Sequence, residues 1–119
     1  MYEYNAKVEK VIDGDTIDVT IDLGFDITVK ERIRFYGINA AEKNTDKGKD
    51  AKTHMIETLP IGTWVTLKTI KDKKEKYGRL LGVITLQDEA KTVLNDALVA
   101  GGYAVPYFGV GSKDNFVPN

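Results

Sequence analysis

The stretch VEKVIDGDTIDVTIDL, residues 8–23, decides the fold. At its centre is Asp13-Gly14, a dipeptide typical of tight β-hairpins because both turn positions favour positive φ. Beyond the turn, apolar side chains occupy every second position, the pattern of a half-buried strand: Ile17, Val19, Ile21 and Leu23. The stretch therefore predicts two antiparallel strands at the start of a β-rich domain.

The rest of the chain supplies three more strands and two helices. The strands are expected from about Thr28 to Ile38, over residues 64–70 with Trp64 in the core, and from Leu80 to Leu86. The helices are expected over residues 46–58, ended by Pro60-Ile61-Gly62, and from an N-cap at Thr92 to Gly101-Gly102. This order is compatible with a mainly β (α+β) fold, a small five-stranded barrel with two rim helices.

Composition bounds the organisation of the chain. Its 119 residues and 13.2 kDa fit one domain, residues 1–119, and the absence of Cys excludes disulfides and thiolate metal sites. Net charge is −1, yet residues 43–79 hold ten Lys/Arg against five Asp/Glu. That asymmetry indicates either one basic surface or simply solvated lysines. Without a signal pattern or an apolar run that could span a bilayer, a soluble, cytoplasmic protein is expected.

Asp15 is the first candidate for chemistry. It has the same parity as Ile17 and Val19, so its side chain should point toward the buried face at the end of the strand. A carboxylate aimed inward must be paired or bind a cation, since burying it alone is very costly. The alternative is an aspartate that caps the turn by bonding its own backbone.

Arg34 and Glu42 form a second group, within the third strand and at its exit. Arg offers a planar fork for two phosphate oxygens, and a Glu at a loop mouth can act as a general base on water. The alternative is a structural group of ion pairs among Glu31, Arg32 and Arg34.

A third group is the turn Lys76-Tyr77-Gly78-Arg79, which enters the fifth strand. Arg79 could add a second guanidinium to a phosphate, with Lys76 as a point charge and Tyr77 as a phenol donor. Tyr107 could stack on a base, with core or rim packing as the alternative. The single histidine, His54, lies among lysines on the first predicted helix, which argues against a histidine-based site.

Four segments, in order, resemble the staphylococcal nuclease (thermonuclease) family: Ile12-Asp13-Gly14-Asp15-Thr16, residues 34–42, Lys76-Tyr77-Gly78-Arg79 and Asn95-Asp96-Ala97-Leu98-Val99. The resemblance runs from about Val8 to Gly109. It implies a five-stranded OB-fold barrel with helices. It also implies enzymes that use Ca²⁺ to cleave DNA and RNA phosphodiesters and leave 3′-phosphate ends.

The resemblance also implies roles for individual residues. Metal ligands would be Asp15, Asn39 and the carbonyl of Ala40. Arg34 and Arg79 would grip the phosphate and stabilise its transition state, while Glu42 would orient or deprotonate the attacking water. The residues that contact the substrate would be Lys76, Tyr77 and Tyr107.

The chain departs from the family pattern at Asn39-Ala40-Ala41-Glu42, where the family usually has Asp-Thr/Ala-Pro-Glu. Asn39 replaces a second calcium carboxylate and keeps an oxygen ligand, so weak Ca²⁺ binding is expected. Loss of the proline is expected to leave the loop around Glu42 less rigid.

The resulting prediction is a monomeric, calcium-dependent nuclease that hydrolyses single-stranded or flexible DNA and RNA with little sequence preference. The alternative is a non-catalytic OB-fold module that binds nucleic acid or a partner protein, its metal site eroded by Asn39. A purely structural domain is the third possibility.

Overall fold

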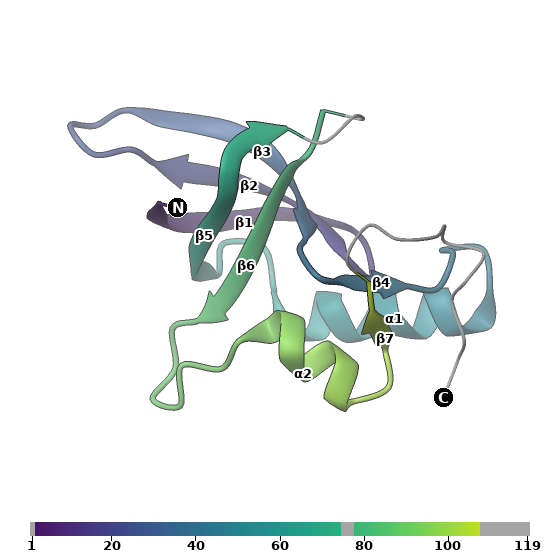
Figure 1. Ribbon diagram of the computed structural model, residues 1–119. Helices are drawn as coiled ribbons and strands as arrows, with labels where there is room; N and C mark the ends of the chain where they lie inside the picture. The colour runs from purple at the N-terminus through teal and green to yellow at the C-terminus, as the bar shows by residue number, and fades with distance from the viewer. Residues whose placement is uncertain (1, 75–77, 108–119) are drawn as a thin grey trace.

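Five strands close into a barrel in the computed structural model, which describes residues 2–74 and 78–107, without the side chains of 71–74 (Figure 1). Around the barrel they are β1 (Glu3–Asp13), β2 (Thr16–Asp22), β3 (Thr28–Phe35), β6 (Leu80–Leu86) and β5 (Trp64–Lys74). Neighbouring strands are antiparallel, except that β3 and β6 are parallel. The expected mainly β, OB-fold architecture with two helices is confirmed.

β1 and β2 form the hairpin that residues 8–23 predict, with Asp13 opposite Thr16. Positive φ does not explain its turn, because positive values occur at other described glycines and not at Gly14. A Cβ on Gly14 would instead lie 2.7 Å from the Cβ of Ala51 and 3.0 Å from the Cβ of Ala40. Glycine is required here because the turn touches two other elements, α1 (Asp46–Thr58) and β4 (Ile38–Ala40).

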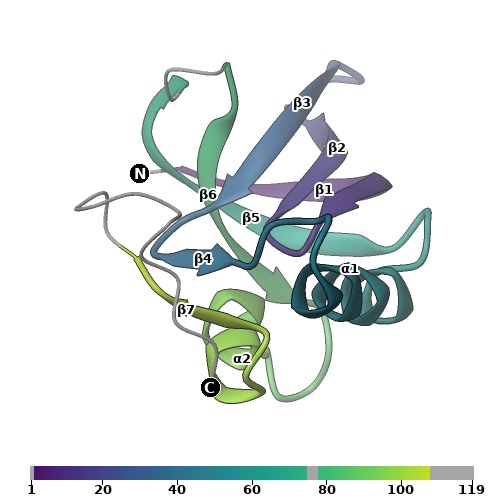
Figure 2. The same cartoon turned by 90° about the vertical axis from the view of Figure 1, so that its right-hand side faces the viewer.

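The expected third strand is in fact two strands. β3 ends at Phe35, and the chain turns at Gly37, whose φ of 79° favours glycine, before β4 begins. β4 pairs antiparallel with β7 (Ala104–Pro106), a short strand that the sequence pattern did not indicate. Figure 2 shows these two strands next to both helices at one end of the barrel.

The first helix, α1, has the predicted bounds, and Thr45 caps it by accepting the N–H of Gly48 at 3.0 Å. The second helix, α2 (Leu94–Ala100), begins after Val93, so the expected N-cap at Thr92 is wrong. The N–H and hydroxyl of Thr92 instead donate to the two carboxylate oxygens of Asp88, at 3.0 and 3.1 Å. Within residues 2–74 and 78–107, neither helix is long and apolar enough to cross a membrane.

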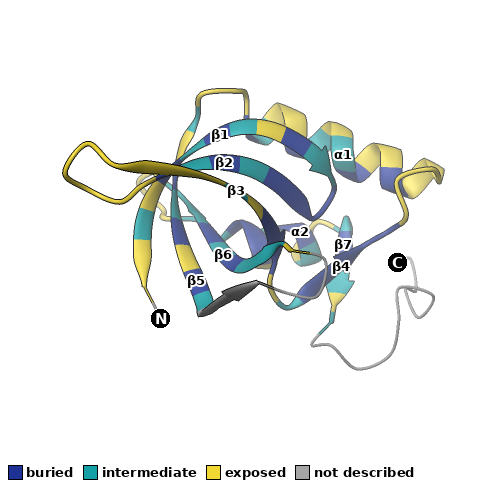
Figure 3. Cartoon of the chain, turned by 90° about the horizontal axis from the view of Figure 1, so that it is seen from above, coloured by how far each residue is buried: buried dark blue, intermediate teal, exposed yellow. Residues whose placement is uncertain are grey.

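Alternate residues of the barrel strands fill its interior (Figure 3). The fully buried side chains include Val8, Ile17, Val19, Ile33, Phe35, Val65, Leu67 and Ile84. Trp64 was expected in this core, but it is 45% exposed. Val65 and Leu67 take the inward positions of β5, so strand alternation turns Trp64 outward.

Candidate functional site

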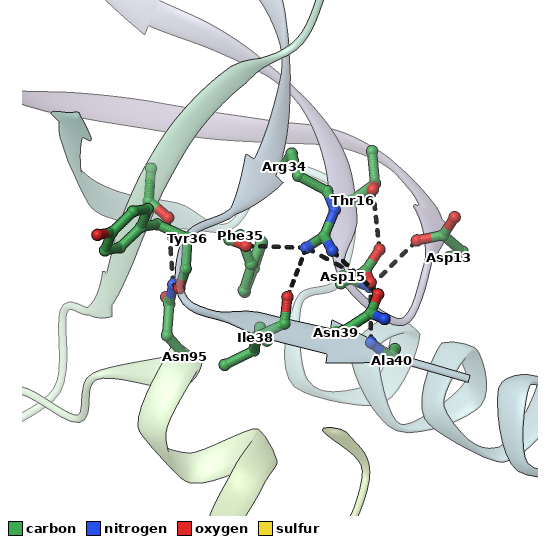
Figure 4. Close-up of polar contacts among 11 residues, drawn as sticks. Asp13, Asp15, Thr16, Arg34, Phe35, Tyr36, Ile38, Asn39, Ala40 and Asn95 are labelled. Atoms are coloured by element: carbon green, nitrogen blue, oxygen red, sulfur yellow. Dashed lines mark hydrogen bonds and ion pairs between the residues drawn. The ribbon is translucent and has the colours of Figure 1, made fainter. Parts of the chain in front are cut away.

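Asp15 lies in the turn between β1 and β2, and its side chain is fully buried, as its parity predicts. One carboxylate oxygen accepts the hydroxyl of Thr16 at 3.1 Å, and the other accepts the N–H of Ala40 at 2.9 Å. The turn is capped by Asp13, whose side chain accepts the N–H of Asp15 at 3.1 Å. The alternative of a turn-capping Asp15 is therefore wrong, because its carboxylate joins the hairpin to β4 (Figure 4).

Arg34 lies near the end of β3 and is only 6% exposed. Its Nη1 donates to the carbonyls of Phe35 and Ile38, both at 2.9 Å, and Nη2 donates to Oδ1 of Asn39 at 3.1 Å. Nη1 also lies 3.5 Å from Oδ2 of Asp15. The turn between β3 and β4 thus wraps around the guanidinium, which places Arg34, Asn39 and Asp15 in one network (Figure 4).

The alternative of ion pairs among Glu31, Arg32 and Arg34 is wrong as well. Arg32 instead binds Asp18 through two nitrogens, at 2.7 and 3.1 Å. This hydrogen bond with Asp18 raises the pKa of Arg32 above its ordinary value. The two arginines of β3 therefore differ: Arg32 makes an exposed ion pair, whereas Arg34 belongs to a buried polar network.

Arg34 keeps donors for a ligand despite this network. A guanidinium has five N–H groups, and the three hydrogen bonds above leave one on Nε and one on Nη2 without an acceptor among the described residues. In the described part of the chain, no buried side-chain nitrogen or oxygen lacks a hydrogen-bond partner. These two N–H groups of Arg34 could bind an anion.

Glu42 follows β4 and is exposed, and its side chain has no hydrogen bond or ion pair to the described residues. Its backbone is held firmly, because its carbonyl accepts both the N–H and the hydroxyl of Thr45, at 3.0 and 2.7 Å. The loop that the missing proline was expected to loosen is thus anchored at the start of α1.

Arg79 directly precedes β6, and it is half-buried. In the parallel ladder, Leu80 and Leu81 lie opposite Ile33 and Arg34. Continuing this register places Arg79 beside Arg32, on the face of the sheet that also carries Arg34. The separation of two positions corresponds to about 7 Å along the strands.

The remaining candidates lie partly outside the described residues. Lys76 and Tyr77 are not described. Tyr107 is half-buried, and its N–H donates at 2.8 Å to the carbonyl of Gly37, within the turn that wraps around Arg34. Tyr107 therefore lies at the same end of the barrel as the network.

Sequence reasoning missed the role of Asn95, which is 3% exposed at the start of α2. Its amide nitrogen donates to the carbonyls of Tyr36 and Gly82, and its oxygen accepts the N–H of Ile84. Asn95 thereby joins the turn after β3 to β6 (Figure 4). A polar residue beside the apolar stripe of α2 was the available signal, because a buried amide needs hydrogen-bond partners.

His54 takes part in packing. Its ring stacks on that of Tyr103, with centroids 4.0 Å apart and planes 6° from parallel. Among the described residues, no three His, Cys, Asp or Glu side chains form a group that could hold a metal.

The three expected metal ligands are of the kind that a hard cation prefers. Their donor atoms are oxygens: the carboxylate of Asp15, the amide oxygen of Asn39 and the carbonyl of Ala40, all in buried residues. Calcium accepts all three ligand types, so the chemistry of the donors fits. Their charge is low, because only one is a carboxylate and Arg34 lies 3.5 Å from it.

Two comparisons with known proteins bear on this arrangement. Residues 32–117 match the family model described as "Staphylococcal nuclease homologue". The chain is 36% identical over 118 residues to Endonuclease YhcR of Bacillus subtilis (strain 168), a match that covers 89% of this chain and 9% of that protein. The chain thus spans a small part of the relative's length. The matched family model covers most of the chain, including Arg34, Asn39 and Glu42, and the chain belongs to the staphylococcal nuclease homologue family.

Proposed function

We propose that this chain is a metal-dependent endonuclease that hydrolyses DNA and RNA phosphodiesters with low sequence specificity and leaves 3′-phosphate ends. The observation that carries the proposal is the buried network in which Arg34 joins Asp15 and Asn39. Family membership and the printed name of the relative, an endonuclease, support it.

Arg34 and Arg79 hold the phosphate in this proposal. Phosphodiester hydrolysis gathers negative charge on the oxygens of the phosphate, and donors fixed in advance stabilise that charge most effectively. Arg34 suits this role because three hydrogen bonds fix its guanidinium before any substrate arrives. Arg79 approaches from β6 on the same face of the sheet.

Glu42 activates the water. Its exposed carboxylate can accept a proton from a water molecule as that water attacks phosphorus, and the bond to the 5′ oxygen then breaks. The leaving 5′ oxygen gains a proton, and the phosphate stays on the 3′ oxygen. The fixed carbonyl of Glu42 limits where its side chain can reach.

Asp15, Asn39 and the carbonyl of Ala40 would hold Ca²⁺. When bound, the ion supplies positive charge to a phosphate oxygen and a template for orientation. A single carboxylate beside Arg34 leads us to propose weak binding, since the number of charged ligands strongly tunes calcium affinity.

A single strand of nucleic acid fits the proposed contacts best. Tyr107 lies at the site's end of the barrel and would flank a base, while Lys76 and Tyr77 would contact phosphate. Unstacked bases are available to aromatic side chains in single strands and flexible regions.

The test is to incubate the purified protein with labelled single-stranded DNA, with Ca²⁺ or with chelator, at graded salt. Calcium-dependent fragments with 3′-phosphate ends are the expected result. A salt-sensitive mobility shift without cleavage would replace the enzyme with a binding module, a reading favoured by the single carboxylate among the buried donors. If neither cleavage nor a mobility shift is seen, a purely structural domain remains as the explanation.

A further inference from the structure

The start of α1 holds the backbone of Glu42. Thr45 uses its N–H and its hydroxyl to donate to the carbonyl of Glu42, at 3.0 and 2.7 Å. The same hydroxyl oxygen accepts the N–H of Gly48 at 3.0 Å. One side chain therefore both caps the helix and fixes the residue proposed to activate water.

Gly48 brings the helix closer to Glu42 than any other residue type could. A Cβ at this position would lie 1.9 Å from the carbonyl oxygen of Glu42 and 2.9 Å from the Cα of Lys43. Both are backbone atoms, so a side chain could be accommodated only by moving the loop. Gly48 is also buried, and positive φ does not explain the glycine. The close approach to Glu42 is what requires glycine here.

The same face of α1 touches the turn that carries Asp15. Ala51 lies three residues after Gly48 and shares its buried face. Its Cβ would be 2.7 Å from a Cβ placed on Gly14, the residue directly before Asp15. Gly48 and Ala51 are small and lie about one helical turn apart. They let the Glu42 loop and the Asp15 turn pack against the same helix.

We propose that Thr45, Gly48 and Ala51 are positioning residues that set the separation between Glu42 and Asp15. The inference rests on the proposed nuclease function. The loop lacks the proline that the family has after Ala40. The contacts with α1 keep the loop rigid in its place. A helix is a stiff spacer, and misplacing a catalytic group by about 1 Å can cost about 10²-fold in rate.

The first arm of the test measures kinetics on single-stranded DNA. Gly48→Ala and Thr45→Val should each lower kcat by about 10²-fold and leave KM within about twofold. Thr45→Ser keeps the hydroxyl and should restore kcat. Thr53→Ala, at an exposed position of the same helix, is the matched control and should leave kcat unchanged.

The second arm separates positioning from a general loss of structure. In a Glu42→Gln background, Gly48→Ala should lower kcat no further, because the group that it misplaces is already gone. A further drop of similar size would overturn the proposal.

If the parent protein does not cleave DNA, the proposed function fails, and NMR then tests the positioning. Gly48→Ala must shift the amide signals of Glu42 and Lys43 and speed hydrogen exchange at Thr45. Unchanged signals would overturn the inference on structural grounds alone.

Discussion

Replacing Arg34 with methionine should destabilise the protein far more than the same change at Arg32, two residues earlier on β3. Each arginine pairs with one aspartate. The side chains of Arg32 and Asp18 are 50% and 30% exposed, whereas those of Arg34 and Asp15 are 8% and 0% exposed. The comparison therefore varies burial while keeping residue type and strand constant.

The magnitude follows from what each change leaves behind. Without Arg34, the buried carboxylate of Asp15 loses this guanidinium, and the carbonyls of Phe35 and Ile38 lose a donor. Removing one partner of a buried ion pair costs about 3–5 kcal/mol. An exposed pair contributes about 0–1 kcal/mol, so R32M should lose no more than that.

Urea unfolding followed by far-UV circular dichroism measures both free energies of unfolding. R34K keeps a cation without the planar fork and should lie between the parent and R34M. The double variant R34M/D15N should be more stable than R34M, because it removes the buried carboxylate that has lost Arg34. If R34M and R32M lose equal stability, or if the double variant gains nothing, the buried pair does not organise this site.

The remaining predictions concern chemistry and local order. Glu42→Gln should lower kcat by about 10²- to 10⁴-fold, the usual contribution of a general base, with binding of single-stranded DNA retained in filter assays. Arg79→Ala should weaken both binding and turnover, each measured by salt titration, since it removes a phosphate contact. Asn39→Asp should tighten Ca²⁺ at least about tenfold by calorimetry, and an unchanged affinity would show that residue 39 is not a ligand. Hydrogen bonds, chiefly from the backbone of Thr92, lower the pKa of Asp88 from 3.8, so its stabilisation is complete above pH 3.8 and is lost as the pH falls through the lowered folded pKa. Protection of the Thr92 amide against hydrogen exchange, relative to its intrinsic rate, should therefore fall at acid pH, and Asp88→Asn should abolish that pH dependence.

Local periodicity predicted most of the fold. The alternation after Asp13-Gly14 gave β2, and the bounds of α1 and β6 agree with the sequence pattern. The errors arise where tertiary contacts decide. Gly14 is needed for its contact with Ala51 rather than for its φ, and no local pattern contains that information. β7 is three residues long and exists because β4 pairs with it, so its own residues carry too little alternation to predict it.

Strand alternation also made part of the candidate site predictable. Parity placed the side chain of Asp15 inward, because a strand's alternation extends to the residue at its end. Two partners of that carboxylate were not predictable, since Arg34 and Ala40 are distant in the sequence. The anchoring of Glu42 by Thr45 was also missed, although a threonine N-cap is a local motif. The reason is that the same hydroxyl serves the helix and the loop, and only the three-dimensional arrangement shows the second contact.

Asn39 can be understood as a consequence of burial. Among the described residues, the buried charged side chains are Asp15 and Arg34, one of each sign. Without a cation, this network is therefore neutral, and burying a second carboxylate at residue 39 would leave an uncompensated charge. An amide keeps the hydrogen bond from Arg34 without that cost, at the expense of calcium affinity. The two effects are linked by mass action: Asn39→Asp should make the metal-free protein less stable and its unfolding temperature more dependent on Ca²⁺. If Asn39→Asp binds calcium more tightly and is as stable as the parent protein without calcium, the charge balance of Asp15 and Arg34 does not explain the asparagine.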